Sequence, residues 1–214
     1  MILRVTAVLA LVLGAAALLA FLHVLGEGPF VSLESSHLRE MKERVDPPTA
    51  VEPVTFDSMI ALPHLRPVGE YSAIERRGVS LEGYVQHVLR ANDGDFHLEL
   101  VANPVAPGQW DTAYVSAEIT PGVRARTDSR PGTSGWSYAA LMERLRPKVG
   151  DVTPWPFGMN RVRISGWLLY DWQYDAPWHG AGHPGQRLTG WEIHPVTGIE
   201  IWNEGLKRFI EVPR

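Results

Sequence analysis

Two histidine–glutamate pairs have the clearest capacity for chemistry in this sequence. His97 is separated by one residue from Glu99, and Glu192 is separated by one residue from His194. Residues two apart in a β-strand lie on the same face, so each pair presents an imidazole and a carboxylate together. Glu118 lies in a further predicted strand and can point the same way. Imidazole and carboxylate groups suit Zn²⁺ or Mn²⁺, which can activate a bound water molecule.

The sequence therefore predicts a divalent metal site, for Zn²⁺ or Mn²⁺, made by His97, Glu118, Glu192 and His194. The chain has no cysteine, which excludes disulfides, thiolate metal ligands and cysteine catalysis. Another interpretation stays open, in which the histidines form hydrogen bonds at a polar barrel edge. The glutamates then pair with Arg161, Arg163 or Arg187.

A long segment rich in aromatic residues follows position 171 and supplies a second candidate site. Its predicted ligand-binding residues are Asp171, Trp172, Tyr174 and Trp178. Aromatic side chains in such a loop can stack on bases or sugar rings. In the alternative interpretation, the tryptophans fill a small core beneath a glycine-rich loop.

Alternation of apolar and polar residues predicts the strands that position these side chains. The predicted strands are 79–91, 95–101, 113–120, 161–171 and 187–196, and helical spacing predicts a helix over 137–146. Asn92-Asp93-Gly94 favours a hairpin between the first two strands. The fold class is therefore mainly β, a five-stranded OB-like Greek-key barrel with one helix between strands 3 and 4. Residues 199–212 are expected to add an edge strand or a short helix.

The N-terminal segment has the composition of a membrane-spanning helix. From Val5 to Leu25 only Thr6 and His23 are polar, and a helix of this length spans about 30 Å. Arg4 precedes the span, which places the N-terminus in the cytoplasm and the rest outside. The alternative is a cleaved signal peptide, because the run contains three successive alanines from position 15.

The chain is thus expected to contain a signal-anchor helix over 1–28, a tether over 29–55 and the OB-like domain over 56–214. The tether combines a polar helix at 32–46 with a proline-rich linker. Residues 56–78 show no clean periodicity and are expected to be an irregular lead-in to the barrel.

Several strings in the predicted strands resemble a family of bacterial proteins that are OB-like and mostly uncharacterised. The strings are LEGYV at 81–85, GDFHLELV at 94–101, AEITP at 117–121, RISGWLLYD at 163–171 and TGWEIHPVTGIEI at 189–201. The resemblance covers about residues 79–201. It implies the OB-like fold and a recurrent polar set, and it implies no particular reaction.

Charge and topology together favour a binding role. The net charge of −4 argues against a general nucleic-acid binder, which is usually basic. The sequence predicts a single-pass protein of the inner membrane that presents an OB-like binding domain outside the cytoplasm. The expected partners are the membrane, through the N-terminal helix, and a glycan, a peptide or an envelope protein. A metal-dependent hydrolase and a structural subunit of an envelope complex are the alternatives.

Overall fold

The computed structural model describes residues 33–106, 112–123, 152–174 and 186–212, and the isolated positions Gly14, Leu141, Glu143 and Gly150. The chain divides into two compact units, Met1–Glu40 and Met41–Arg214. Every strand that the structure describes belongs to the second unit, which also holds the candidate site.

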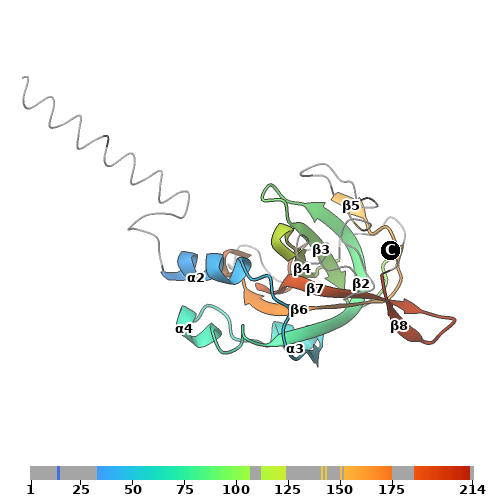
Figure 1. Cartoon of the computed structure of the whole chain (residues 1–214), viewed down its shortest axis with the longest axis horizontal. Coiled ribbons are helices and arrows are strands. Elements are labelled where there is room, and N and C mark those ends of the chain that lie inside the picture. The colour runs from blue at the N-terminus through green and yellow to red at the C-terminus, as the bar shows by residue number, and fades with distance from the viewer. Residues whose placement is uncertain are drawn as a thin grey trace, which may run out of the picture. The chain divides into compact units, whose positions relative to one another are not determined.

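Five strands form a closed barrel in the second unit: β2 (Gly78–Arg90), β3 (Phe96–Val101), β4 (Val115–Ile119), β6 (Val162–Tyr170) and β7 (Trp191–Asn203) (Figure 1). They pair in the order β2-β3-β4-β7-β6, and β6 also pairs with β2. The β4–β7 pair is parallel and the others are antiparallel. This is the five-stranded Greek-key arrangement of an OB-fold, so the predicted mainly β, OB-like barrel is confirmed.

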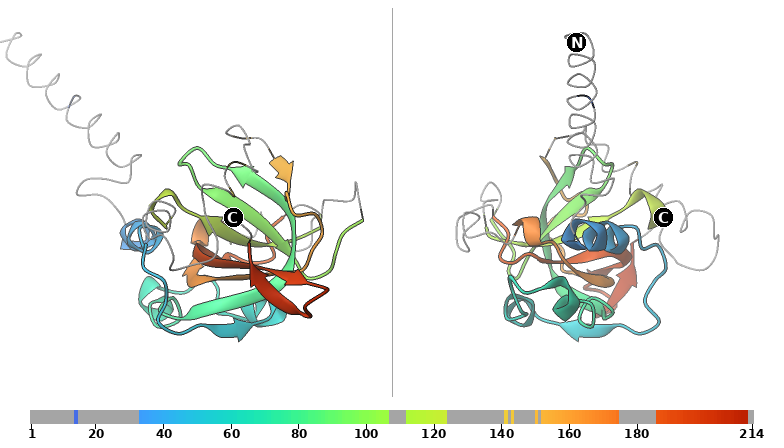
Figure 2. Two further views of the ribbon diagram at one scale, coloured as in Figure 1. Left: turned by 45° about the vertical axis from the view of Figure 1, so that its right-hand side comes forward. Right: turned by 90° about the vertical axis from the view of Figure 1, so that its left-hand side faces the viewer.

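Strand β2 closes the barrel because it is long enough to pair with two neighbours. Its first half, through Gly83, pairs with β6, and its second half, from Tyr84, pairs with β3. A register shift between Val85 and His87 marks an irregularity in the second half, and such irregularities bend strands. Figure 2 shows the strand curving along one side of the barrel.

Alternate residues of the strands fill the barrel core. The core side chains contributed by β2, β3, β4 and β7 include Leu81, Leu98, Ala117 and Ile193, all fully buried. The predicted hairpin at 92–94 is present, with Gly94 at a φ of 93°. This left-handed conformation explains why glycine occupies the turn.

The segment before the barrel has more regular structure than the sequence pattern indicates. It contains α2 (Leu33–Lys42), β1 (Glu52–Val54), α3 (Phe56–Ile60) and α4 (Val68–Tyr71). Helix α2 ends before the predicted position 46, and β1, inside the predicted linker, pairs in parallel with β2.

The lead-in over 56–78 was predicted as irregular, yet it begins with a capped helix. Thr55 and Ser58 form a reciprocal capping box at the start of α3. The usual pattern has Glu or Gln at the position of Ser58, so this helix start gave a weak signal. Met59 and Tyr71 then contribute buried side chains to the core.

The end of the barrel also differs in its boundaries. Strand β7 starts and ends later than the predicted strand 187–196, and β8 (Arg208–Glu211) pairs with it as an edge strand. A short strand, β5 (Val152–Pro154), pairs with β2 and was not predicted. Of the predicted helix at 137–146, the structure describes Leu141 and Glu143, and both are helical.

The predicted membrane span over 5–25 lies outside the described residues, apart from Gly14. Among the helices of the described part, none has both the length and the apolar character needed to cross a bilayer. The anchor therefore stays a prediction from the sequence.

Candidate functional site

A cluster of buried charged side chains lies on the outer face of β4 and β7. Register pairs Ala117 with Ile193, and both point into the core. Their neighbours Glu118, Glu192 and His194 therefore project from the opposite face, although at most 1% of the surface of each residue is exposed. Charged side chains are rarely buried this completely unless they are paired.

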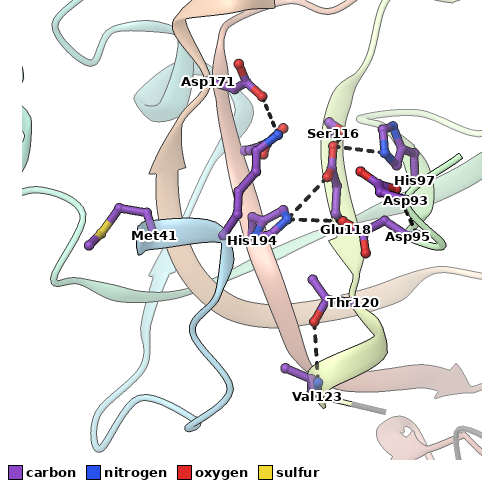
Figure 3. A network of polar contacts seen from close by, with 12 residues as sticks. Met41, Asp93, Asp95, His97, Ser116, Glu118, Thr120, Val123, Asp171 and His194 are labelled. Atoms are coloured by element: carbon purple, nitrogen blue, oxygen red, sulfur yellow. Dashed lines mark hydrogen bonds and ion pairs between the residues drawn. The ribbon is translucent and has the colours of Figure 1, made fainter. Parts of the chain in front are cut away.

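We call five residues the ionic cluster: Asp95, Glu118, Arg187, Glu192 and His194. They come from two barrel strands, β4 and β7, and from the two loops that follow β2 and β6. In OB-folds these two loops and the adjacent sheet face form the usual ligand-binding region. The cluster therefore occupies the place where this fold usually binds its ligands. Figure 3 shows its members Asp95, Glu118 and His194 close together.

Glu118 is the centre of the cluster. Its Oε1 accepts a hydrogen bond from Arg187 Nη2 at 3.0 Å, and His97 Nε2 lies 3.4 Å from the same oxygen. Its Oε2 lies 3.3 Å from His194 Nε2. Burial alone would raise the pKa of Glu118, but the two imidazoles and the guanidinium hold this pKa well below its usual value. Glu118 is therefore an ionised carboxylate.

The pKa values of Glu192, His194 and His97 are shifted in different directions. Burial, reinforced by the charge of Glu118, raises the pKa of Glu192 to about 8 despite the nearby guanidinium of Arg187. Burial would lower the pKa of His194, but the carboxylates around it raise this pKa to about 9. Burial lowers the pKa of His97. The cluster thus contains one firmly ionised glutamate and one that is readily protonated.

Arg187 connects the cluster to the aromatic loop. Its Nη1 donates a hydrogen bond to Glu192 Oε2, and its Nη2 donates to Glu118. The ring of Tyr174 lies over the guanidinium, with the centroid 3.8 Å from Cζ. This stacking adds a cation–π interaction to the two ion pairs and leaves Arg187 buried beneath an exposed ring.

Asp171 and the neighbouring aromatic residues lie at the end of β6. Asp171 is fully buried; its Oδ2 pairs with Lys42 Nζ at 2.8 Å, and its Oδ1 accepts from the backbone of Gln173. Trp172 and Tyr174, within a 3-10 turn, are 38% and 40% exposed. Asp171 is thus engaged inside the protein, while the two aromatic rings face solvent.

The segment that carries Lys42 is bound across β6 and β7. Arg44 donates hydrogen bonds to the carbonyl oxygens of Leu168 at 2.9 Å and His194 at 2.8 Å. Trp167 Nε1 donates to the carbonyl of Asp46 at 2.6 Å. These contacts hold the start of the second unit against the sheet next to the cluster.

The structure brings together most of the residues that the sequence predicted as metal ligands. His97 and His194 approach the two oxygens of Glu118, as the metal hypothesis requires. Neither His97 nor Glu192, however, belongs to the group that can hold an ion, and Glu192 is bound by Arg187. The alternative interpretation, in which the glutamates pair with Arg187, describes these contacts.

Other predicted pairs form elsewhere or lie outside the described residues. Arg161 and Arg163 pair with Glu82 on the neighbouring strand, away from the cluster's glutamates. Glu99 pairs with His87. Trp178, predicted to contact a ligand, is outside the described residues.

Sequence reasoning missed two members of the site. Asp95 lies two residues before His97, and the strand period places both on the same face, but Asp95 is not among the predicted ligands. It supplies the third group, with Glu118 and His194, whose ligand atoms lie within 4.8 Å of one another. Lys42 gave no signal, because it belongs to a polar helix with an ordinary pattern of charges.

Comparisons with known proteins add little to this geometry. No family model matches the sequence, and no curated protein matches it. Among solved structures, asparaginyl-tRNA synthetase from Entamoeba histolytica is similar with a TM-score of 0.35 and 14% identity, over 77% of this chain and 25% of that chain. The same enzyme in complex with asparaginyl-adenylate gives 0.33 and 15%, over 78% and 25%. The chain spans about a quarter of the length of those synthetase chains.

Proposed function

We propose that this chain is a membrane-anchored OB-fold binding protein that captures an oligosaccharide outside the cytoplasm. The observation that carries the proposal is the pair of half-exposed rings, Trp172 and Tyr174, in one 3-10 turn from which Tyr174 stacks on Arg187 of the buried ionic cluster. Aromatic rings provide flat apolar surfaces that stack on sugar rings, and the OB-fold commonly binds oligosaccharides in this region.

The charges around the rings favour an oligosaccharide over a nucleic acid. Four carboxylates lie in or next to the cluster: Asp95, Glu118, Asp171 and Glu192. The nearby cations Arg187 and Lys42 are both engaged in ion pairs with these acids. A polyanion would gain little from these paired cations, so the exposed rings of Trp172 and Tyr174 provide the surface for the ligand.

Titration of the full-length chain in detergent with neutral and N-acetylated oligosaccharides, followed by tryptophan fluorescence, tests the ligand class. We expect saturable binding that Trp172→Ala or Tyr174→Ala weakens at least about fivefold, the loss of one stacking contact. Leu206→Ala is the control, because Leu206 is exposed in the β7–β8 hairpin and should leave binding unchanged. Binding of oligonucleotides or peptides alone, or no effect of either aromatic substitution, would refute the proposed ligand.

The membrane location rests on the apolar run from Val5 to Leu25 behind Arg4. Alkaline phosphatase fused after Arg214 is active only outside the cytoplasm, so we expect high activity in a bacterial host. The fusion should also stay in the membrane during carbonate extraction. An inactive fusion contradicts the topology, and a released, shortened protein shows signal-peptide cleavage instead of anchoring.

A further inference from the structure

His194 presents a buried imidazole nitrogen to two carboxylates from different parts of the chain. Its Nε2 lies 3.3 Å from Glu118 Oε2 and 3.5 Å from Asp95 Oδ2. Within the described part of the chain, neither ring nitrogen of His194 has a partner with hydrogen-bond geometry. The ring is fully buried and its Nε2 faces both oxygens, an arrangement in which a cation bound between the three atoms would satisfy all of them.

The two separations from His194 Nε2 match edges of a tetrahedral zinc site, and all three ligand atoms lie within 4.8 Å of one another. With metal–ligand bonds of about 2.1 Å, neighbouring ligand atoms of a tetrahedron are about 3.4 Å apart. Octahedral coordination with bonds of the same length would bring adjacent ligand atoms to about 3.0 Å. From this geometry, we propose that Asp95, Glu118 and His194 bind one Zn²⁺ ion.

The surrounding residues hold the proposed ligands in place. Arg187 binds the other oxygen of Glu118, which fixes the carboxylate with Oε2 toward His194. The side chain of Asp93 accepts a hydrogen bond from the Asp95 backbone at 3.1 Å and so stabilises the turn that carries Asp95. Partners of this kind orient metal ligands and raise metal affinity.

The charges and ligand number suit the ion. Two carboxylates balance the charge of Zn²⁺, and a neutral imidazole completes three protein ligands. Three protein ligands leave a fourth tetrahedral position for water, as in zinc sites that act on substrates. This proposal does not depend on oligosaccharide binding. The metal ligands are buried side chains, whereas the proposed sugar contacts are the exposed rings of Trp172 and Tyr174.

Metal analysis of the full-length chain, purified in detergent without chelators, tests the site. After removal of metal with EDTA, we expect titration with Zn²⁺ alone to restore about one ion per chain and to raise the melting temperature by several degrees. Asp95→Asn and His194→Gln should each weaken Zn²⁺ binding by at least about a hundredfold. Co²⁺ in the unmodified chain should give the strong visible absorption of tetrahedral coordination, a readout that does not depend on the variants folding.

Two matched controls separate this site from other histidine and glutamate groups. His87→Gln removes an imidazole that pairs with Glu99 and should leave Zn²⁺ binding unchanged. Glu192→Gln should also retain the ion, because Glu192 is bound by Arg187. The proposed site is refuted if the folded, unmodified chain binds neither Zn²⁺ nor Co²⁺. It is also refuted if Glu192→Gln abolishes Zn²⁺ binding while Asp95→Asn binds Zn²⁺ normally. Titration of the metal-free chain with oligosaccharides tests the proposed oligosaccharide binding separately from the metal site.

Discussion

Replacing Arg187 with methionine is expected to destabilise the barrel by about 3–5 kcal/mol. The substitution removes the guanidinium that pairs with Glu118 and Glu192, whose side chains are 2% and 0% exposed. Removing one partner of a buried ion pair leaves an uncompensated charge in a low-dielectric environment, and costs of this size are typical. Thermal unfolding of the full-length chain, followed by circular dichroism, should show a melting temperature lower by roughly 10 °C.

Arg77→Met is the control for this experiment. Arg77 forms an ion pair with Glu52, and the two side chains are 40% and 50% exposed. Solvent screens such a pair, so its loss should cost less than about 1 kcal/mol. Equal losses for Arg187→Met and Arg77→Met would show that burial of the cluster does not amplify its electrostatics.

A double substitution tests whether Arg187 acts through its carboxylates. When Glu192→Gln is added to Arg187→Met, one of the two acids that have lost the guanidinium is removed. The destabilisation should then be smaller than the sum of the two single effects, because contacting residues couple. Additive losses would assign the cost of Arg187→Met to packing, for example against the Tyr174 ring.

The barrel was predictable because its strands and its first turn are specified by residues that are close together in the sequence. Alternation identified the inward-facing residues, as with Leu98 on β3, and the turn at Gly94 fixed the first hairpin. Boundaries were less certain where a strand continues without a break in pattern, as in β7, which runs to Asn203. The short helix α3 was missed because Ser58 closes its capping box in place of a longer acidic side chain.

The site was predictable only in part because its contacts are distant in sequence. The two-residue period of a strand places Glu192 and His194 on one face. It does not show whether another segment of the chain packs over that face and buries it. Segment 41–46 packs across β6 and β7 through Arg44, whose partner His194 is far along the chain. No local sequence pattern predicts that segment 41–46 packs over β6 and β7, or that Lys42 pairs with Asp171.

The folding of the site also depends on one glycine opposite β7. A Cβ added at Gly166 would lie 2.2 Å from the carbonyl oxygen of Pro195 and 2.8 Å from a side-chain carbon of Ile193. Backbone cannot rotate away as a side chain can, so β6 and β7 would have to separate locally. Gly166→Ala is therefore expected to cost about 3 kcal/mol or more, at the upper end of overpacking effects.

Gly198→Ala is the matched control on the same strand pair. A Cβ at Gly198 would meet Ser165 at 3.5 Å, an ordinary contact distance, and the expected cost is below about 1 kcal/mol. Pro195 follows His194 directly, so the shift forced by Gly166→Ala should also displace the imidazole from Asp95 and Glu118. We therefore expect Gly166→Ala to lower both the melting temperature and Zn²⁺ affinity, whereas Gly198→Ala changes neither. Equal stability of the two variants would mean that the close approach of β6 to Pro195 does not position His194.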